Sequence, residues 1–249
     1  STAPGQALGY GLQYTRLAML LMDAPEGTSC SLEVIDDLAV QADDDSSRLV
    51  QVKSTHTGNP ISDRALPLWK TLHNWLRLAQ NNNVIPDRAR FELYISKQCA
   101  GTIADAFSRA GSIEEARIAL QAAKDTLWGA PPEHLKKGSL GSELGQHVTT
   151  FLEGPEKLVL PIIMHFKVEC GSGSPQSDLQ EKIRRLVLSP KNVLDITDKA
   201  CGWVKRNVDT QLEQQLPAVL ATDDFRRELL GYIQRIERSA ILRSIAPPP

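Results

Sequence analysis

The sequence predicts an α/β fold, with a strand-containing core in residues 1–100 and a mostly helical region in residues 101–249. Two patterns in the core indicate one strand and one helix. Residues 91–96 alternate between apolar and polar side chains, which is typical of a half-buried strand. Residues 67–80 place apolar side chains at helical spacing with polar residues between them, which is typical of an amphipathic helix. We expect one continuous domain over all 249 residues.

The elements of the core follow one another in a simple order. A glycine-containing start leads into a helix that ends near Asp23. Three stretches with strand character follow and predict a β-meander: 29–35, 37–41 and 48–54. The amphipathic helix comes next, with Pro67 near its first turn. Its apolar stripe consists of Leu68, Leu72, Trp75, Leu76 and Ala79.

Helix signals dominate the region after residue 100. Ser112 and Glu115 form a capping-box pattern that opens a helix to about Trp128. Residues 157–168 are rich in Val, Ile and Leu, and we expect a buried strand there. Further helices are predicted to start near Ser177, Ser189 and Thr222.

The composition is that of a soluble globular protein and excludes several classes of function. Hydrophobic residues make up 41% of the chain and charged residues 23%, with a mean hydropathy of −0.25. No apolar run approaches the roughly 18–20 residues of a membrane span. The four cysteines lie far apart without a CxxC pair, which argues against a zinc site or a disulfide scaffold. We therefore expect a reducing, cytoplasmic environment.

Charge is distributed unevenly along the chain. Residues 1–60 carry three basic and eight acidic side chains, whereas residues 61–249 carry 25 basic and 22 acidic ones. Because the chain as a whole has no basic field, contacts with DNA must come from local patches or from an oligomer. The candidate phosphate-contacting residues are Lys70, Arg77, Lys97, Arg184 and Arg185.

The most specific pattern consists of polar residues on successive predicted strands. Since side chains alternate along a strand, Glu33 and Asp37 can share one face, and Gln51 and Lys53 must share a face of the next strand. Pairing of these strands would bring Asp37 to Gln51 and Lys53. A carboxylate, an amide oxygen and the Val52 carbonyl are hard oxygen ligands that suit Mg²⁺, with Mn²⁺ as a substitute. Lys53 would orient or deprotonate an attacking water and offset charge on a phosphate.

At these residues the sequence resembles the PD-(D/E)xK superfamily of restriction-endonuclease-like nucleases, in the Mrr-like form with a Gln-x-Lys motif. The resemblance is carried by Gln13 in the leading helix, the acidic run 33–37, Gln-Val-Lys at 51–53 and residues 68–75. These are more narrowly similar to the double-stranded DNA endonuclease domain of bacterial anti-phage effectors, as found in CBASS and Lamassu systems. The similarity covers residues 5–100, and the helical remainder agrees only in general plan.

The resemblance implies a restriction-endonuclease-like core of helix, β-meander, helix and strand, elaborated by a C-terminal helical region. Gln51 replaces the usual distal acid and removes a negative charge, so binding of two metals would require Glu33 as a further ligand. The implied roles are metal ligation by Asp37 and Gln51, catalysis by Lys53, an auxiliary acid at Glu33 or Asp36, and a helix contact from Gln13.

The implied activity is Mg²⁺-dependent hydrolysis of phosphodiester bonds in double-stranded DNA, as the effector of an anti-phage defence system. Such an effector must stay silent until it is triggered, so we expect activation by homo-oligomerisation or by a sensor partner. The main alternative is a catalytically inactive nuclease-fold domain that docks a partner such as an SMC-like ATPase. A nuclease directed at RNA is the third possibility. No role in a membrane is expected.

Overall fold

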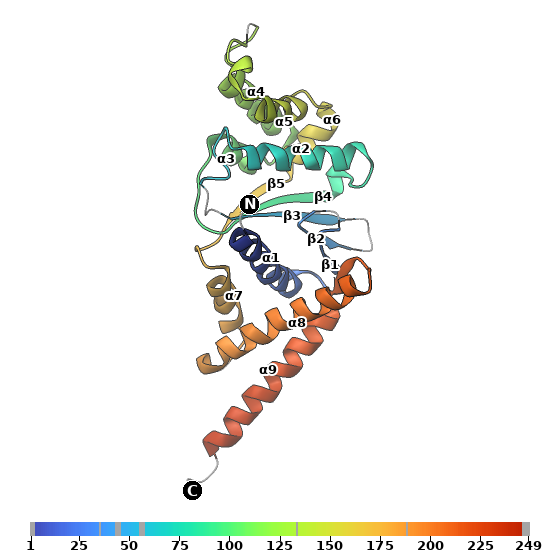
Figure 1. The fold of residues 1–249 in the computed structure, drawn as a ribbon, viewed down its shortest axis with the longest axis vertical. Helices are drawn as coiled ribbons and strands as arrows, with labels where there is room; N and C mark the ends of the chain where they lie inside the picture. The colour runs from blue at the N-terminus through green and yellow to red at the C-terminus, as the bar shows by residue number, and fades with distance from the viewer. Residues whose placement is uncertain are drawn as a thin grey trace. The chain divides into compact units, whose positions relative to one another are not determined.

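The computed structural model describes residues 3–34, 36–42, 46–54, 58–132, 134–187 and 189–245, and it has a mixed α/β fold (Figure 1). The chain divides into two compact units. Residues 1–44 and 172–249 form the first, which we call the terminal unit. Residues 45–171 form the second, the central unit.

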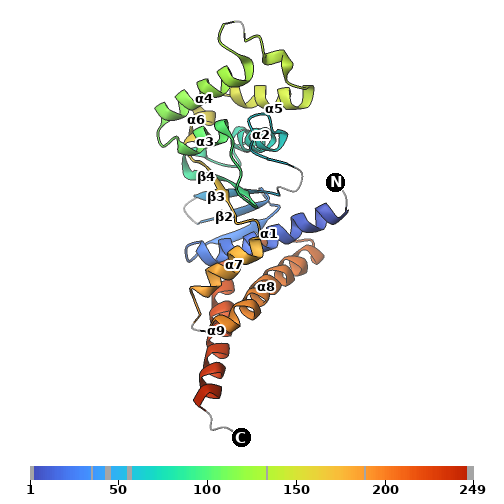
Figure 2. The same cartoon turned by 90° about the vertical axis from the view of Figure 1, so that its left-hand side faces the viewer.

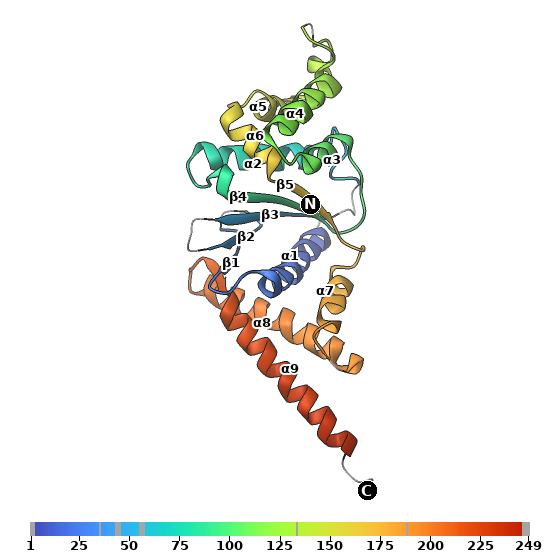
Figure 3. The same cartoon turned by 180° about the vertical axis from the view of Figure 1, so that it is seen from behind.

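Segments from both ends of the chain build the terminal unit. Its strands are β1 (Ser29–Leu32), β2 (Leu38–Gln41) and β6 (Ala218–Ala221). Its helices are α1 (Ala3–Asp23), α7 (Pro175–Arg184), α8 (Val193–Glu213) and α9 (Thr222–Ile245), with a 3₁₀ turn at η3 (Pro190–Asn192). Helices α1, α7 and α8 pack against one another (Figure 2). Helix α9 follows β6 directly and leads to the C-terminal residues (Figure 3).

The strands of the terminal unit are antiparallel in the order β2-β1-β6, so that Cys30 in β1 pairs with Val40 and with Leu220. The outer edge of β6 is closed by a side chain. The Gln211 amide donates to the Val219 carbonyl and accepts from the Val219 N–H, both at 2.7 Å. Because an open edge strand is a template for pairing with other chains, this contact protects the edge. The sequence pattern did not indicate it.

The central unit is a parallel βαβ arrangement. Its strands are β3 (Ser47–Lys53), β4 (Ala89–Ile95) and β5 (Phe166–Cys170), in the order β3-β4-β5. Its helices are α2 (Leu66–Gln80), α3 (Thr102–Arg109), α4 (Ile113–Trp128), α5 (Ser142–Leu152) and α6 (Glu156–Met164), with 3₁₀ turns at η1 (Pro86–Arg88) and η2 (Lys137–Ser139). The long connections between parallel strands carry these helices, as parallel pairing requires.

Helix α2 confirms the predicted amphipathic helix and supplies the centre of the core. Trp75 packs against Phe91 in β4 and Phe166 in β5, with ring centroids 5.3 and 6.1 Å apart. Trp69 is fully buried as well, and its indole donates to the Asp63 carbonyl at 2.8 Å. Each buried tryptophan contributes about 4–6 kcal/mol of hydrophobic stabilisation, at about 25 cal/mol per Å². The predicted N-cap of α4 is also confirmed, since the Ser112 hydroxyl accepts from the Glu115 N–H.

The expected strand at 157–168 is wrong. This segment forms helix α6 with Pro161 inside it, and a strand, β5, begins only at Phe166. A continuous apolar run fits a buried helix as well as a buried strand, because periodicity distinguishes them only when one face is polar. Helix α6 is enclosed by α2, α3 and α4 and buries residues around its circumference, including Val159, Leu160, Ile162 and Ile163.

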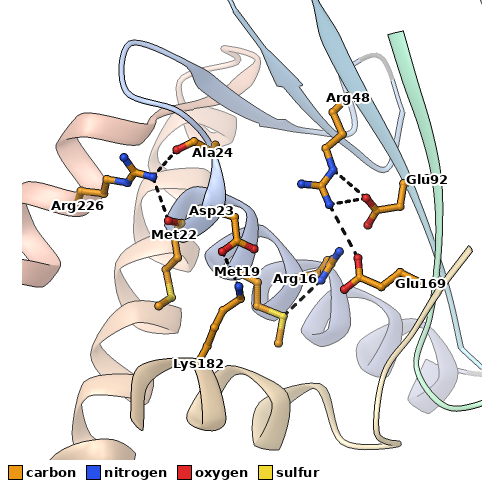
Figure 4. A network of polar contacts seen from close by, with 10 residues as sticks. All are labelled: Arg16, Met19, Met22, Asp23, Ala24, Arg48, Glu92, Glu169, Lys182 and Arg226. Carbon is orange, nitrogen blue, oxygen red and sulfur yellow. Dashed lines mark hydrogen bonds and ion pairs between the residues drawn. The ribbon is translucent and has the colours of Figure 1, made fainter. Parts of the chain in front are cut away.

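Charged side chains fix elements within each unit (Figure 4). In the terminal unit, Arg226 of α9 donates to the Met22 carbonyl at 3.0 Å and to the Ala24 carbonyl, which caps the C-terminal end of α1. In the central unit, Arg48 of β3 donates from Nε to the buried Glu92 of β4 at 2.8 Å. Glu169 of β5 lies 3.9 Å from the same guanidinium, so the three parallel strands are linked by one charged network.

Candidate active site

The acidic residues of the predicted site lie at one turn in the terminal unit. Glu33 follows β1 directly, and Asp36 and Asp37 precede β2, so the expected strands at 29–35 and 37–41 are each shorter than predicted. The Glu33 N–H donates to the Asp37 carbonyl at 3.0 Å, and the Asp36 carboxylate accepts from the Asp37 N–H at 2.9 Å. Glu33 and Asp37 are therefore opposite each other at the base of the turn, rather than on one face of a single strand.

Helix α1 adds an amide to this turn. The Gln13 Nε2 donates to the Glu33 Oε1 at 3.0 Å, across 20 residues of sequence. The Gln13 Oε1 is buried and has no hydrogen-bond partner among the described residues. An amide oxygen of this kind has the capacity to accept a hydrogen bond or to bind a cation. We call Gln13, Glu33, Asp36 and Asp37 together the acidic corner.

Glu33 has a left-handed backbone conformation, with φ of 56°. This conformation costs a residue with a side chain about 1–2 kcal/mol, and such residues cluster at functional sites. Glycine would adopt it without cost. Glu33 therefore gives this turn a less stable backbone than glycine would.

The conformation of Glu33 leads to a stability prediction. We expect Glu33→Gly to be about 1 kcal/mol more stable than Glu33→Ala, because both variants lose the carboxylate and only glycine relieves the backbone. The matched control is the exposed neighbour Val34, which lies outside the left-handed region. There the order reverses, and Val34→Gly should be about 0.5–1 kcal/mol less stable than Val34→Ala. Urea unfolding measures both differences, and the same order at both positions would contradict the account.

The Gln-x-Lys segment of the predicted site lies in strand β3 of the central unit. Strand β3 is continuous over Ser47–Lys53, which confirms that Gln51 and Lys53 share one face. In the parallel register Gln51 pairs with Leu93 and Lys53 pairs with Ile95, so this face is the one that holds Phe91 and contacts α2. Gln51 is only 6% exposed and Val52 8%, whereas Lys53 is half-buried.

The expected phosphate-contacting residues are all exposed in their own units. Lys70 and Arg77 lie seven positions apart on the outer face of α2, and Lys97 follows β4. Arg184 and Arg185 lie at the end of α7, where Arg184 pairs with Glu181 at 3.4 Å. Each of these side chains is therefore accessible to a ligand within its own unit.

The donor chemistry of the acidic corner fits a hard cation. Glu33 and Asp37 offer carboxylate oxygens and Gln13 offers an unpaired amide oxygen, which are ligand types that Mg²⁺ accepts while it keeps several waters. Within the described ranges, no group of three or more His, Cys, Asp or Glu side chains is placed to hold a metal ion. The corner is therefore a carboxylate and amide site that requires water or further ligands to complete it.

Comparison with known proteins adds no family to these observations. The chain matches no protein-family model, and no curated protein is similar to it. Among the helices in the described parts of the chain, none combines the length and apolar character that crossing a bilayer requires.

Proposed function

We propose that the protein is a metal-dependent endonuclease that hydrolyses phosphodiester bonds of double-stranded DNA. The observation that carries this proposal is the acidic corner, in which a strained Glu33 and an unpaired Gln13 oxygen accompany Asp37. The resemblance of residues 33–53 to the nuclease motif supports the same assignment.

In the proposed mechanism the Mg²⁺ ligands are those that the sequence motif implies. Asp37 and Glu33 would supply carboxylates, and Gln51 and the Val52 carbonyl would supply neutral oxygens. Mg²⁺ held by these residues would supply Lewis-acid polarisation of a phosphoryl oxygen and would lower the pKa of a bound water. The Lys53 ammonium would donate a hydrogen bond to the phosphate oxygen on which negative charge develops. It would also orient the attacking water. Gln13 holds the Glu33 carboxylate in place through its donated hydrogen bond.

The low net charge of the chain supports a form of DNA binding that requires several copies to assemble. The chain has a formal net charge of −2, so a single copy has little general attraction for a polyanion. We propose that Lys70, Arg77 and Lys97 contact phosphates, and that Arg184 and Arg185 add to them when copies assemble. An effector of anti-phage defence that must remain inactive before infection would gain its basic surface in this way, through homo-oligomerisation or a sensor partner.

Metal binding provides the first test of the proposal. We expect the native chain to bind Mn²⁺ and the Asp37→Asn variant to bind it about 10–100-fold more weakly, because one charged ligand is lost. Electron paramagnetic resonance of free Mn²⁺ measures both affinities directly. The control is Asp87→Asn, an exposed acidic residue of η1 in the central unit, which should bind as the native chain does. Equal affinities of the native chain and Asp37→Asn would overturn the assignment.

One observation favours the second candidate, a catalytically inactive interaction domain. Gln51 is almost completely buried on the face that contacts α2, where a core glutamine needs no metal to explain it. An inactive domain of this kind would bind Mn²⁺ weakly and without regard to Asp37. The same titration therefore distinguishes the two functions.

A further inference from the structure

Two histidines form a direct contact between helices α2 and α5 of the central unit. The Nδ1 atoms of His73 and His147 are 2.6 Å apart, with ring centroids 4.8 Å apart and planes inclined at 61°. Both rings are half-buried, so protons from solvent can reach them. Neither residue belongs to the predicted nuclease site.

Only some protonation states are compatible with this geometry. A hydrogen bond between two Nδ1 atoms needs one N–H donor and one nitrogen with a free lone pair. The accepting ring must therefore be neutral, whereas the donating ring can be neutral or cationic. When both rings are protonated, two N–H groups and two positive charges face each other at hydrogen-bond distance. The contact is attractive with one extra proton or none, and repulsive with two.

The environment of His73 favours its neutral form. Burial lowers the pKa of His73 below its usual 6.5, and the charges of His147 and Arg77 lower it further. Arg77 lies on α2 itself and His147 on α5, whereas α6, which also packs against α2, adds no charged group to these influences among the described residues. Since the folded chain binds this proton less readily than the unfolded chain, stability is present at neutral pH and decreases as the pH falls below about 6.5.

Helix α5 is the element that responds to this contact. It has 11 residues, and isolated helices shorter than about 12–15 residues are marginal in water, so α5 depends on packing against α2. Phe151 provides the apolar component of that packing against Trp69, with ring centroids 6.3 Å apart. The histidine pair adds a polar contact one helical turn before Phe151 in α5.

We propose that His73 and His147 form an acid-sensitive latch that holds α5 on α2 at neutral pH and releases it when both rings are protonated. The latch is independent of the proposed nuclease site. Histidine is suited to this role because its charge changes between about pH 5 and pH 8.

Hydrogen exchange of the full chain, followed by mass spectrometry in the presence of EDTA, tests the latch. After correction for intrinsic exchange rates, amides of α5 should exchange about fivefold or more faster at about pH 5 than at about pH 7.5, as expected for loss of one hydrogen bond. His147→Gln cannot take up the second proton and should abolish this acceleration. His147→Lys carries one permanent charge that neutral His73 can accept, so it should exchange slowly at neutral pH and keep the acceleration when His73 is protonated. His165→Gln, outside the pair, should behave as the native chain.

Two further results decide the outcome. Imidazole ¹⁵N shifts should show opposite tautomers at His73 and His147 at neutral pH, with one ring protonated at Nδ1 and the other at Nε2. Loss of this signature should coincide with the faster exchange of α5. The proposal is overturned if His147→Gln retains the full acid response, or if α5 in the native chain exchanges equally at both pH values.

Discussion

Replacing Gly101 by alanine is expected to destabilise the chain by about 3–5 kcal/mol. A Cβ atom at Gly101 would lie 1.8 Å from the Ile61 carbonyl oxygen and 2.8 Å from its carbon, and backbone atoms cannot move aside as a flexible side chain can. The segment that follows β3 would have to shift. Two hydrogen bonds that hold it would then be lost: Asn59 to the Ala100 carbonyl at 2.7 Å, and the Ile103 N–H to Asp63 at 2.9 Å.

Urea unfolding followed by circular dichroism measures the effect of Gly101→Ala. Gly138→Ala is the matched control, because an added Cβ there meets nothing within 4 Å and the backbone is not left-handed. It should change the free energy of unfolding by no more than about 0.5 kcal/mol. A loss smaller than about 1 kcal/mol for Gly101→Ala would mean that this close approach of the two backbone segments does not exist in solution.

The second large effect is expected at Lys53. Lys53→Met should reduce the single-turnover rate of DNA cleavage about 10²–10⁴-fold, because the ammonium that offsets charge on the phosphate is lost. Mn²⁺ affinity should remain within about threefold of the native value, since Lys53 is not a ligand and its removal takes a positive charge from the metal site. Lys53→Arg retains the charge and should keep some of the rate.

Lys157→Met is the control for Lys53, because Lys157 is an exposed lysine of α6 in the same unit. Its cleavage rate should equal that of the native chain. If Lys53→Met cleaves DNA within about threefold of the native rate, Lys53 has no catalytic role and the Gln-x-Lys motif is fortuitous.

Sequence patterns predicted the helices and strands whose signals lie within a short stretch of the chain. Helix α2 has one apolar and one polar face, so its period is visible, and its expected stripe from Leu68 to Ala79 is buried. The Ser112 cap of α4 was predicted from its capping-box residues. The strand at β4 was predicted as well, but it is buried on both faces rather than half-buried, because β3 and β5 flank it in the sheet. The apolar run at 157–168 failed because a helix that is buried all round has no polar face to reveal its period.

Long-range features could not be predicted from local patterns. Strand β6 joins β1 across almost 190 residues, and this pairing makes the terminal unit discontinuous. In the candidate site, the pattern nominated Glu33 and Asp37 but gave no sign of the left-handed backbone at Glu33, because residue type does not favour that conformation for glutamate. The His73–His147 contact joins residues 74 positions apart, which no spacing motif describes.

Metal-dependent DNA cleavage tests the central claim most directly. Supercoiled plasmid is incubated with the native chain and with Asp37→Asn at high protein concentration, in Mn²⁺ and in EDTA. We predict nicking or linearisation by the native chain in Mn²⁺ and none in EDTA or by the variant, which should remain folded by circular dichroism. Cleavage that persists in EDTA or in Asp37→Asn would contradict the assignment as a nuclease, as would a native chain that binds Mn²⁺ but cuts no DNA even as an oligomer.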